Sequence, residues 1–423
     1  MTDRNANRPG YKQTRVGWIP EEWSVTHLEE ISEINKENLP ASTPDDYSFT
    51  YISLGDVDSG IISISSDQIT FSTAPSRARR IIHKGDILLS TVRPYLKGFT
   101  YIDFLPKDII CSTGFAVITP NNDIDGKFLY QYIFSKKAEK YFNACVVGSN
   151  YPALNNSDVE KMSIPLPQPS EQKKIAEILS TWDRAIEQTR QLIDAKQRLK
   201  KGLMQQLLTG RMRFPGFGAP VEKTGELPEG WEERPLKNIL KLKLRKEEKP
   251  NKPFDKLGIR SHGKGIFINA NECPSSYSME YFYRVKEDDI VVNITFAWEG
   301  AIAYVGPEGD NTLVSHRFPT YAANERVINV HYLKYLIHTN RFFYDLGTIS
   351  PGGAGRNRVM NKTDFLKLRV QYPALDEQKH ISDFLKTLDS QIEVLKSLLT
   401  NYIWQKSGLM QTLLSGAITT KNS

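Results

Sequence analysis

Several features are scarce in this chain of 423 residues, and each scarcity narrows its class. Its three cysteines, Cys111, Cys145 and Cys273, are odd in number and far apart, which indicates neither a disulfide framework nor a zinc site. No apolar run approaches the roughly 18 residues of a membrane-spanning helix, and no hydrophobic segment follows the charges of the first residues. We therefore expect a cytoplasmic protein without a secretory signal.

Motifs that carry catalysis are also missing. Gly258 to Lys264 has the Gly-x4-Gly-Lys spacing of a phosphate loop, but Gly265 follows instead of the Ser or Thr that would hold magnesium. The seven histidines contain no pair at metal-ligand spacing with a supporting carboxylate, and no Gly-x-Ser-x-Gly elbow occurs. A common nuclease arrangement and the Asn/Asp-Pro-Pro-Tyr/Phe segment of amino-methyltransferases are absent too. We expect no catalytic residue and no metal site, which favours binding over catalysis.

What the sequence does have is repetition. EQKKIAEIL from Glu171 returns as EQKHISDFL from Glu377, and GLMQQLLTG from Gly202 returns as GLMQTLLSG from Gly408, both 206 positions later. The pairs PEEW and PEGW, KGDILLSTVRP and EDDIVVNITFAW, and LNNSD and MNKTD match at offsets of 203 to 208. Offsets that recur at separate places exclude chance similarity, so the chain consists of two similar halves.

Each half begins with a globular segment and ends with a long helix. Short apolar runs such as FTYISL, DILLSTV, FAVITP, YFYRVK and DIVVNITF, separated by Gly, Pro, Asp and Ser, predict strands. Apolar residues at helical spacing predict one helix over 125–142 and its counterpart over 330–346. The expected fold class is α+β. The expected ranges are 1–160 and 228–368 for the globular domains, 161–210 and 369–423 for the helical segments (the second with a C-terminal tail), and 211–227 for a linker.

The long helices follow a heptad spacing of four and three residues, which places one apolar seam on each helix. The seam residues are Ile175, Leu179, Trp182, Ile186, Ile193, Leu203 and Leu207 in the first helix, and Ile381, Leu385, Leu388, Ile392, Leu395, Leu399, Leu409 and Leu413 in the second. In the first helix Thr189, Lys196 and Lys200 interrupt the apolar seam, so they either face partner helices or bend the seam.

An apolar seam of this length needs a partner, and the other copy has the same period and length. We expect an antiparallel coiled coil that relates the halves by a pseudo-twofold axis and brings the N-terminus to the end of the second helix. The alternative is that each helix docks separately on its own domain. Each helix of about 40 residues would be roughly 60 Å long at ~1.5 Å per residue.

The net charge of +6 is compatible with nucleic-acid binding without requiring it, so the placement of the charges matters more. Basic, aromatic and Asn side chains in loop-like stretches are candidates for DNA contacts, although any one of them could be an ordinary surface residue. The candidates are Arg77, Arg79, Arg80, Arg93, Tyr95, Lys97, Asn150, His262, Lys264, His316, Arg317, Arg356, Asn357 and Arg358. Trp298 fits a core aromatic better.

The PEEW and PEGW openings, GDILLSTVRP, the PLPQPSEQKKIAEIL and YPALDEQKHISDFL junctions and the paired GLMQ endings resemble the specificity subunit of type I restriction-modification systems. The resemblance covers nearly the whole chain. It implies two target recognition domains, separated by two conserved antiparallel helices. Each domain would read one half of a bipartite, asymmetric DNA target, and the helix pair would set the distance between the two halves.

The resemblance also implies partners and cofactors. The family's subunit is not catalytic itself. It recruits two methyltransferase subunits, which use S-adenosylmethionine, and nuclease-translocase restriction subunits, which use ATP and Mg, so no cofactor is expected in this chain. Two other hypotheses come from different classes: a coiled-coil scaffold without a DNA role, and a stand-alone DNA-modifying enzyme with an unrecognised active site.

Overall fold

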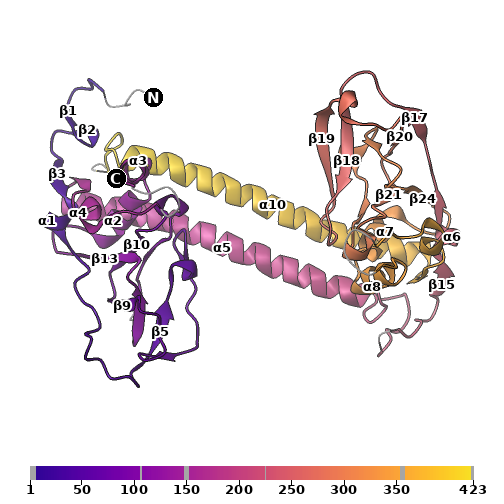
Figure 1. Ribbon diagram of the computed structural model, residues 1–423, viewed down its shortest axis with the longest axis horizontal. Helices are drawn as coiled ribbons and strands as arrows, with labels where there is room; N and C mark the ends of the chain where they lie inside the picture. The colour runs from indigo at the N-terminus through magenta and orange to yellow at the C-terminus, as the bar shows by residue number, and fades with distance from the viewer. Residues whose placement is uncertain (1–5, 105–106, 147–151, 224, 353–357, 421–423) are drawn as a thin grey trace. The chain divides into compact units, whose positions relative to one another are not determined.

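The computed structural model describes residues 6–104, 107–146, 152–223, 225–352 and 358–420 (Figure 1). It divides into two compact units. Unit 1 comprises Met1–Arg190 with Ser397–Ser423, and unit 2 comprises Gln191–Lys396. The two long helices, α5 (Pro169–Leu207) and α10 (Leu375–Leu413), therefore each contribute residues to both units.

Unit 1 contains two four-stranded sheets and three strand pairs. The first sheet has the order β11 (Phe99–Tyr101), β10 (Ile87–Ser90), β13 (Phe115–Pro120), β4 (Ser32–Ile34). The second sheet has the order β8 (Ile69–Thr70), β5 (Ser48–Ile52), β12 (Ile109–Ser112), β9 (Ala78–Ile81). The pairs are β1 (Tyr11–Thr14) with β2 (Gly17–Pro20), β3 (Ser24–His27) with β14 (Ser163–Leu166), and β6 (Val57–Asp58) with β7 (Ile61–Ile62).

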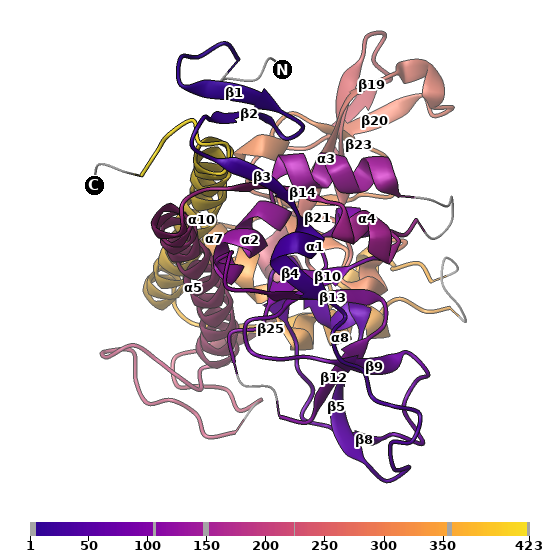
Figure 2. The same ribbon diagram turned by 90° about the vertical axis from the view of Figure 1, so that its left-hand side faces the viewer.

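The first sheet is buried on both faces, which explains why β10 reads as an unbroken apolar run. Ile87 and Leu89 enter a cluster with residues of the helices, whereas Leu88, between them, enters a cluster with Ile52 and Cys111 of the second sheet. Successive side chains of a strand point to opposite faces, so alternate residues serve two cores. The helices are α1 (Leu28–Ile31), α2 (Gly126–Ile133), α3 (Lys136–Cys145) and α4 (Asn156–Glu160), and Figure 2 shows them on the side of β10 and β13 away from β5, β8 and β12.

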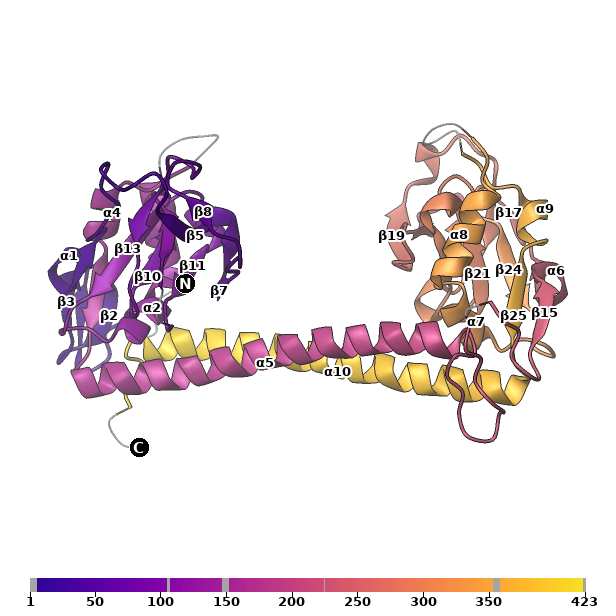
Figure 3. The same cartoon turned by 90° about the horizontal axis from the view of Figure 1, so that it is seen from below.

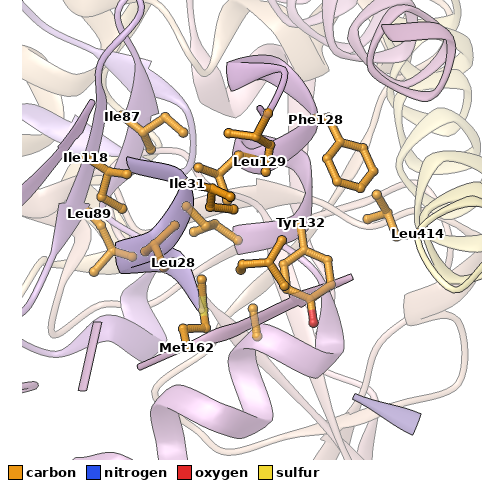
Figure 4. Packing of buried hydrophobic residues seen from close by; sticks show 14 of the residues in the cluster. Leu28, Ile31, Ile87, Leu89, Ile118, Phe128, Leu129, Tyr132, Met162 and Leu414 are labelled. Atoms are coloured by element: carbon orange, nitrogen blue, oxygen red, sulfur yellow. The ribbon is translucent and has the colours of Figure 1, made fainter. Parts of the chain in front are cut away.

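The cluster between the first sheet and the helices is the main core of unit 1 (Figure 4). Its labelled side chains are Ile87, Leu89 and Ile118 from the sheet, Leu28 and Ile31 from α1, Phe128, Leu129 and Tyr132 from α2, and Met162 and Leu414. Ile175 and Leu179 of α5 and Leu413 of α10 belong to the same cluster. Both long helices are thus part of the core of the domain and do not merely follow it in sequence.

Unit 2 repeats this plan. Its first sheet has the order β16 (Leu240–Leu242), β24 (Thr320–Ala323), β21 (Asp289–Val292), β22 (Ile302–Tyr304), and its second has the order β17 (Lys246–Glu248), β20 (Tyr281–Arg284), β23 (Leu313–Val314), β18 (Phe254–Ile259), β19 (Ile266–Glu272). A further pair joins β15 (Glu232–Pro235) to β25 (Arg369–Tyr372). The helices are α6 (Leu236–Ile239), α7 (Val330–Leu336), α8 (Asn340–Thr348) and α9 (Lys362–Phe365). Ile290 and Val292 of β21 face a cluster with helix residues, and Val291 faces the second sheet.

The structure differs from the sequence-based expectation at two kinds of boundary. The single helices expected over 125–142 and 330–346 are each two helices, because Ser135 and Thr339 act as N-caps that accept hydrogen bonds from Ala138 N and Phe342 N and start α3 and α8. The first residues of the expected helical segments form strands β14 and β25 before α5 and α10 begin. Each long helix has 39 residues.

Within each unit, α5 and α10 lie side by side and run in opposite directions (Figure 3). In unit 1 the rings of Trp182 and Tyr402 meet edge to face at 5.6 Å between centroids. In unit 2 Lys196 Nζ donates a hydrogen bond to Gln391 Oε1 at 2.8 Å. The antiparallel pairing expected from the heptad pattern is confirmed in both units. The alternative, in which each helix docks separately on its own domain, is wrong.

The repeated Glu-Gln dipeptide at the start of each long helix has a structural reason. Gln172 donates to Pro167 O and accepts from Asp125 N, which precedes α2, and Gln378 does the same with Pro373 O and Asn329 N, which precedes α7. Both Gln side chains are buried. Each one therefore joins the start of a long helix to the start of α2 or α7 in its own domain, through backbone groups that would otherwise be unpaired.

The Glu of this dipeptide contacts the opening of the domain. Glu171 accepts a hydrogen bond from Trp23 Nε1 at 3.0 Å, and Glu377 accepts one from Trp231 Nε1 at 3.3 Å. Glu377 also pairs with Arg213, and the hydrogen bonds from Arg213 to this carboxylate raise the pKa of the guanidinium. The PEEW opening thus contacts the first EQ junction, and the PEGW opening contacts the second in the same way.

The end of each long helix also meets a domain opening. In unit 1 Gly416 follows α10, with φ of 69°, and a Cβ there would lie 2.4 Å from Pro20 Cδ, so only glycine fits. Tyr11 Oη donates to Gly416 O at 2.6 Å and Arg8 donates to Ala417 O at 2.9 Å. The first described residues of the chain therefore pack on the end of the second long helix, as the sequence predicts.

Candidate nucleic-acid interface

Three of the DNA residues predicted for unit 1, Arg93, Tyr95 and Lys97, lie on the turn that follows β10. Thr91 N and Thr91 Oγ1 both donate to Gly114 O at 2.9 Å, and Thr91 O accepts from Leu154 N at 2.9 Å. Arg93 N donates to Pro152 O at 2.8 Å. These bonds bring three segments that are distant in sequence, around residues 91–98, 113–114 and 152–154, to one end of the first sheet.

The turn after β21 in unit 2 has the same backbone frame. Ile294 N donates to Arg317 O at 3.0 Å, and Met360 N donates to Ile294 O at 2.8 Å. Arg317 is 203 positions after Gly114, and Met360 is 206 positions after Leu154, so these bonds are the counterparts of those made by Thr91. The two units share the frame and differ in the side chains that it carries.

The arginines of β9 and its preceding loop in unit 1 differ in how free they are for a ligand. Arg77 is exposed, and its carbonyl accepts from Thr113 N, which places it at the end of the sheet that carries the turn. Arg79 stacks over the ring of Phe71 at 4.4 Å and donates to Ala78 O. Arg80 donates to Asn38 Oδ1 at 3.0 Å, and partial burial lowers the pKa of its guanidinium. Arg77 is therefore better placed for a phosphate than its two neighbours.

The turn itself presents Tyr95, which is 49% exposed, beside the exposed Arg93. Lys97 closes the turn and pairs with Glu139 of α3 at 2.9 Å. Asn150, also predicted to contact DNA, lies outside the described residues. The exposure of Tyr95 shows that it is not a core aromatic residue.

In unit 2 the side chains predicted to contact DNA come from separate segments of the chain. His262 and Lys264 are exposed in a loop whose backbone bonds the turn, with His262 N donating to Glu299 O at 2.7 Å and Gly263 N to Gly300 O at 3.0 Å. His316 is exposed, and its carbonyl accepts from Lys362 Nζ at 3.3 Å. The loop of His262 and Lys264 is thereby joined to the turn that follows β21, and Lys362, a basic residue that the sequence-based prediction did not include, contacts His316.

Of the arginines predicted to contact DNA in unit 2, the two that the structure describes, Arg317 and Arg358, have different surroundings. Arg317 is exposed at the turn and donates to Thr295 Oγ1 at 3.2 Å. Arg358 donates to Ser350 O and Gly347 O at 3.1 Å and lies over the ring of Trp298 at 4.9 Å. Arg358 therefore caps the end of α8 and covers Trp298, which leaves Arg317 as the better candidate for DNA contact.

Two of the predicted residues of unit 2 have no description. Arg356 and Asn357, in the glycine-containing loop before Arg358, lie outside the described residues. An open cleft of about 1030 Å³ is lined by the loop Gly263–Gly265, which includes Lys264, and by Lys334, Lys386 and Lys396 among others. These four lysines face three acidic side chains in the same cleft, so its charge is mixed.

The helix pair is held by polar contacts as well as by its apolar seam. Within the described part of the chain, the seam residues named from the sequence are all buried or half-buried. Lys200 pairs with Asp389 in unit 2, and Lys406 pairs with Asp183 at 2.6 Å in unit 1. Lys406 lies 206 positions after Lys200, and Asp389 lies 206 positions after Asp183, so the same ion pair occurs once in each unit.

These ion pairs correct the interpretation of the polar seam positions. Lys200 donates a hydrogen bond to Asp389 on the other long helix instead of facing the helix of a partner protein. Thr189 is buried, and its hydroxyl donates a hydrogen bond to Ala185 O within the same helix. Each Asp also bonds its own domain, with Tyr335 Oη donating to Asp389 at 2.8 Å and Gln131 Nε2 donating to Asp183 at 2.6 Å. The pair of long helices is thus joined to α7 in unit 2 and to α2 in unit 1.

The described residues were also considered as metal ligands and as membrane-spanning helices. Among the described residues, no group of three or more His, Cys, Asp and Glu side chains is placed to hold a metal ion. Over the same ranges, none of the helices is both long and apolar enough to cross a membrane.

Comparison with known proteins identifies the class. A family model described as the type I restriction modification DNA specificity domain matches residues 20–195 and 228–401, one match in each half. The chain belongs to this family. It is a specificity subunit, the DNA-recognition subunit of a type I restriction-modification system and not a catalytic one.

Individual relatives agree with this assignment. The type I restriction enzyme MjaVIII specificity subunit of Methanocaldococcus jannaschii is 26% identical over 427 residues, covering 96% of this chain and 95% of the relative. The crystal structure of a type I restriction-modification system S subunit from M. genitalium has a TM-score of 0.53 at 16% identity, covering 92% of this chain and 96% of the other. A structure from work on complex assembly of the type I R-M system has a TM-score of 0.56 at 20% identity and covers 95% and 99%.

Proposed function

We propose that each of the two recognition domains reads one half of a bipartite, asymmetric DNA target, with unspecified base pairs between the halves. The observation that carries this is the turn frame that the two units share with different side chains: Gly114 in unit 1 stands where unit 2 has Arg317, and the carbonyl of each accepts a hydrogen bond from the turn. One frame with different side chains favours two readers that dock alike on DNA but select different bases, because phosphate contacts position a protein and base-edge contacts specify the sequence.

We propose further that the chain directs two methyltransferase subunits and restriction subunits to this target. S-adenosylmethionine, ATP and Mg would then be bound by those subunits, and the whole assembly would act in the cytoplasm. Exposed apolar side chains on the long helices support a protein partner there: Leu192 and Leu199 lie seven residues apart on α5, and Trp404 on α10 is 75% exposed. A coiled-coil surface that also binds partners would couple recognition to their recruitment.

The test exchanges one side chain at the shared frame. We expect Arg317→Ala, assembled with methyltransferase subunits, to relax one position of one half-site, because a bidentate arginine contact discriminates by about 1–3 kcal/mol. Arg326→Ala, an exposed arginine before α7, is the matched control and is expected to leave the motif unchanged. The readout is the set of methylated sites across a genome.

The outcomes separate the readings. An unaltered motif in the Arg317→Ala assembly would remove Arg317 from base recognition. A change in both half-sites would contradict one reader per domain. Methylation by the isolated chain with S-adenosylmethionine would support the stand-alone enzyme instead, and DNA affinity that does not fall with salt would argue against phosphate contacts.

A further inference from the structure

The turn Pro94–Leu96 of unit 1 presents two neighbouring apolar side chains to the surroundings. Tyr95 is 49% exposed and Leu96 is 59% exposed, whereas Pro94, before them, is buried. An exposed Leu or Tyr on its own is ordinary, but two consecutive ones at the tip of a turn form a protruding apolar edge.

The turn is held firmly from both sides. Arg93 and Lys97, which flank it, have φ of 50° and 55°, a region that residues other than glycine seldom adopt. Leu96 N donates to Arg93 O and Lys97 N to Pro94 O at 2.9 Å, Arg93 N to Pro152 O at 2.8 Å, and Ser59 N to Lys97 O at 3.1 Å. A strained backbone that this many hydrogen bonds hold in place indicates that the turn has a function, namely to expose Tyr95 and Leu96.

The counterpart in unit 2 has an aromatic residue at the same position but does not present it. Trp298, 203 positions after Tyr95, is only half-buried, yet its Nε1 is buried without a partner within the described residues, and Arg358 covers the ring. Glu299 takes the place of Leu96 and accepts a hydrogen bond from Ser261 at 2.7 Å. The apolar edge is therefore a property of unit 1 alone and is not needed to build the frame.

The surroundings of the turn are mainly cationic. Arg93 and Lys97 flank it, and α3, which packs beside it, carries Lys136, Lys137 and Lys140 as well as Glu139, which pairs with Lys97. Cations around an apolar tip suit a polyanion that also offers flat apolar surfaces, which duplex DNA does at its base steps.

We propose that Tyr95 and Leu96 form a wedge that enters a base step of the duplex at or next to the half-site of the first domain. The wedge unstacks that step, and the cations around it hold the flanking phosphates. This inference rests on the proposed DNA-reading function and deepens it, because it makes the first half-site depend on the deformability of a base step as well as on base-edge contacts.

The experiment uses the chain in complex with its methyltransferase partners and duplexes of its methylated motif, with 2-aminopurine placed in turn through the first half-site and its flanks. We expect 2-aminopurine fluorescence to rise on binding at one step other than the base that the methyltransferase extrudes for methylation. In the double variant Tyr95→Ala with Leu96→Ala we expect that rise to disappear and affinity to fall about tenfold, since aromatic–base stacking has this magnitude.

Two controls keep the result interpretable. Tyr95→Phe keeps the ring and is expected to retain the fluorescence rise. Tyr344→Ala removes a tyrosine that is 69% exposed on α8 of unit 2 and is expected to behave as the unaltered chain does. Unchanged thermal unfolding of each variant shows that it folds.

Three outcomes would overturn the wedge. Target binding without a fluorescence rise at any position other than the extruded base would do so, and so would a double variant that behaves as the unaltered chain. Loss of methyltransferase co-purification with unchanged DNA affinity would make the turn a protein contact instead. Failure of the unaltered complex to prefer its motif over other duplexes is a different result, because it would contradict the proposed function itself.

Discussion

At the scale of single residues, Glu377 and Glu171 occupy equivalent positions with different partners. Glu377 accepts hydrogen bonds from Arg213 and Trp231, and the side chains of Glu377 and Arg213 are each 3% exposed. Glu171 accepts from Trp23 and from the backbone of Thr420, both neutral donors. The same carboxylate is therefore part of a buried ion pair in one unit and of neutral hydrogen bonds in the other.

This difference makes a prediction about stability. We expect Glu377→Gln to lower the free energy of unfolding by about 3–5 kcal/mol, because it leaves the Arg213 guanidinium buried without a counter-charge. Glu171→Gln, the matched control, should cost about 1 kcal/mol, since it weakens neutral hydrogen bonds only. Denaturant unfolding of the purified chains measures both, and equal losses would contradict the role given to Arg213.

The residue-scale features that the sequence predicted are those with a repeated local pattern. The EQ dipeptides and the PEEW and PEGW openings were recognised as repeats, but only the structure shows that they contact each other. The DNA-facing residues were predicted less well, because an arginine in a loop looks the same whether it caps a helix, as Arg358 does, or is exposed at a turn, as Arg317 is.

At the scale of elements, the helix pair carries one ion pair twice. Lys200 with Asp389 and Lys406 with Asp183 bond across the seam, and each Asp also bonds a domain helix. Polar groups within an apolar seam specify register, because any slip leaves them unpaired. The heptad pattern predicted the seam, but Lys200 was interpreted as an interruption of it, since its partner Asp389 lies outside the seam positions.

We expect Lys200→Met to lower the free energy of unfolding by about 1.5–3 kcal/mol, the range of a hydrogen bond to a charged group. Lys201→Met, at the exposed neighbouring position, is the control and should have little effect. A charge swap, Lys200→Asp with Asp389→Lys, tests the pairing directly. If the swap were no more stable than the Lys200→Met variant, the ion pair would not be what holds this register.

Strands were predicted well where they are buried on both faces, as in β10 and β21, because a short apolar run between turn residues is too short for a typical helix and favours a strand. The helices after the sheets were predicted as one where there are two. Hydrophobic spacing continues across Ser135 and Thr339, and only their capping hydrogen bonds break the helix.

At the scale of the whole molecule, the sequence established two similar halves, and the structure gives each unit a four-stranded first sheet, a second sheet of four strands in unit 1 and five in unit 2, the same helix order and equivalent junctions. What the repeat could not give is the identity of the bases read, because the shared frame carries unlike side chains in the two units. Base recognition depends on a few side chains, and the structural surroundings of these side chains differ between the two units more than the neighbouring sequence does.

The helix pair is proposed to set the gap between the half-sites, and this can be tested by length. One heptad added to each long helix at facing positions, beside Ile193 and Leu395, adds about 10 Å at ~1.5 Å per residue. We expect the gap to grow by about three base pairs at ~3.4 Å each while both half-sites stay the same. Altered half-sites with an unchanged gap, read from methylated sites, would refute the helix pair as a spacer.

The most direct test of the account is the motif methylated by the complete assembly, obtained by sequencing modified bases in a genome that encodes this chain with its methyltransferase partner. If each recognition domain reads one half-site, the motif consists of two short, different specified sequences separated by a fixed number of unspecified base pairs. A single continuous recognition sequence, or two identical halves, would contradict it.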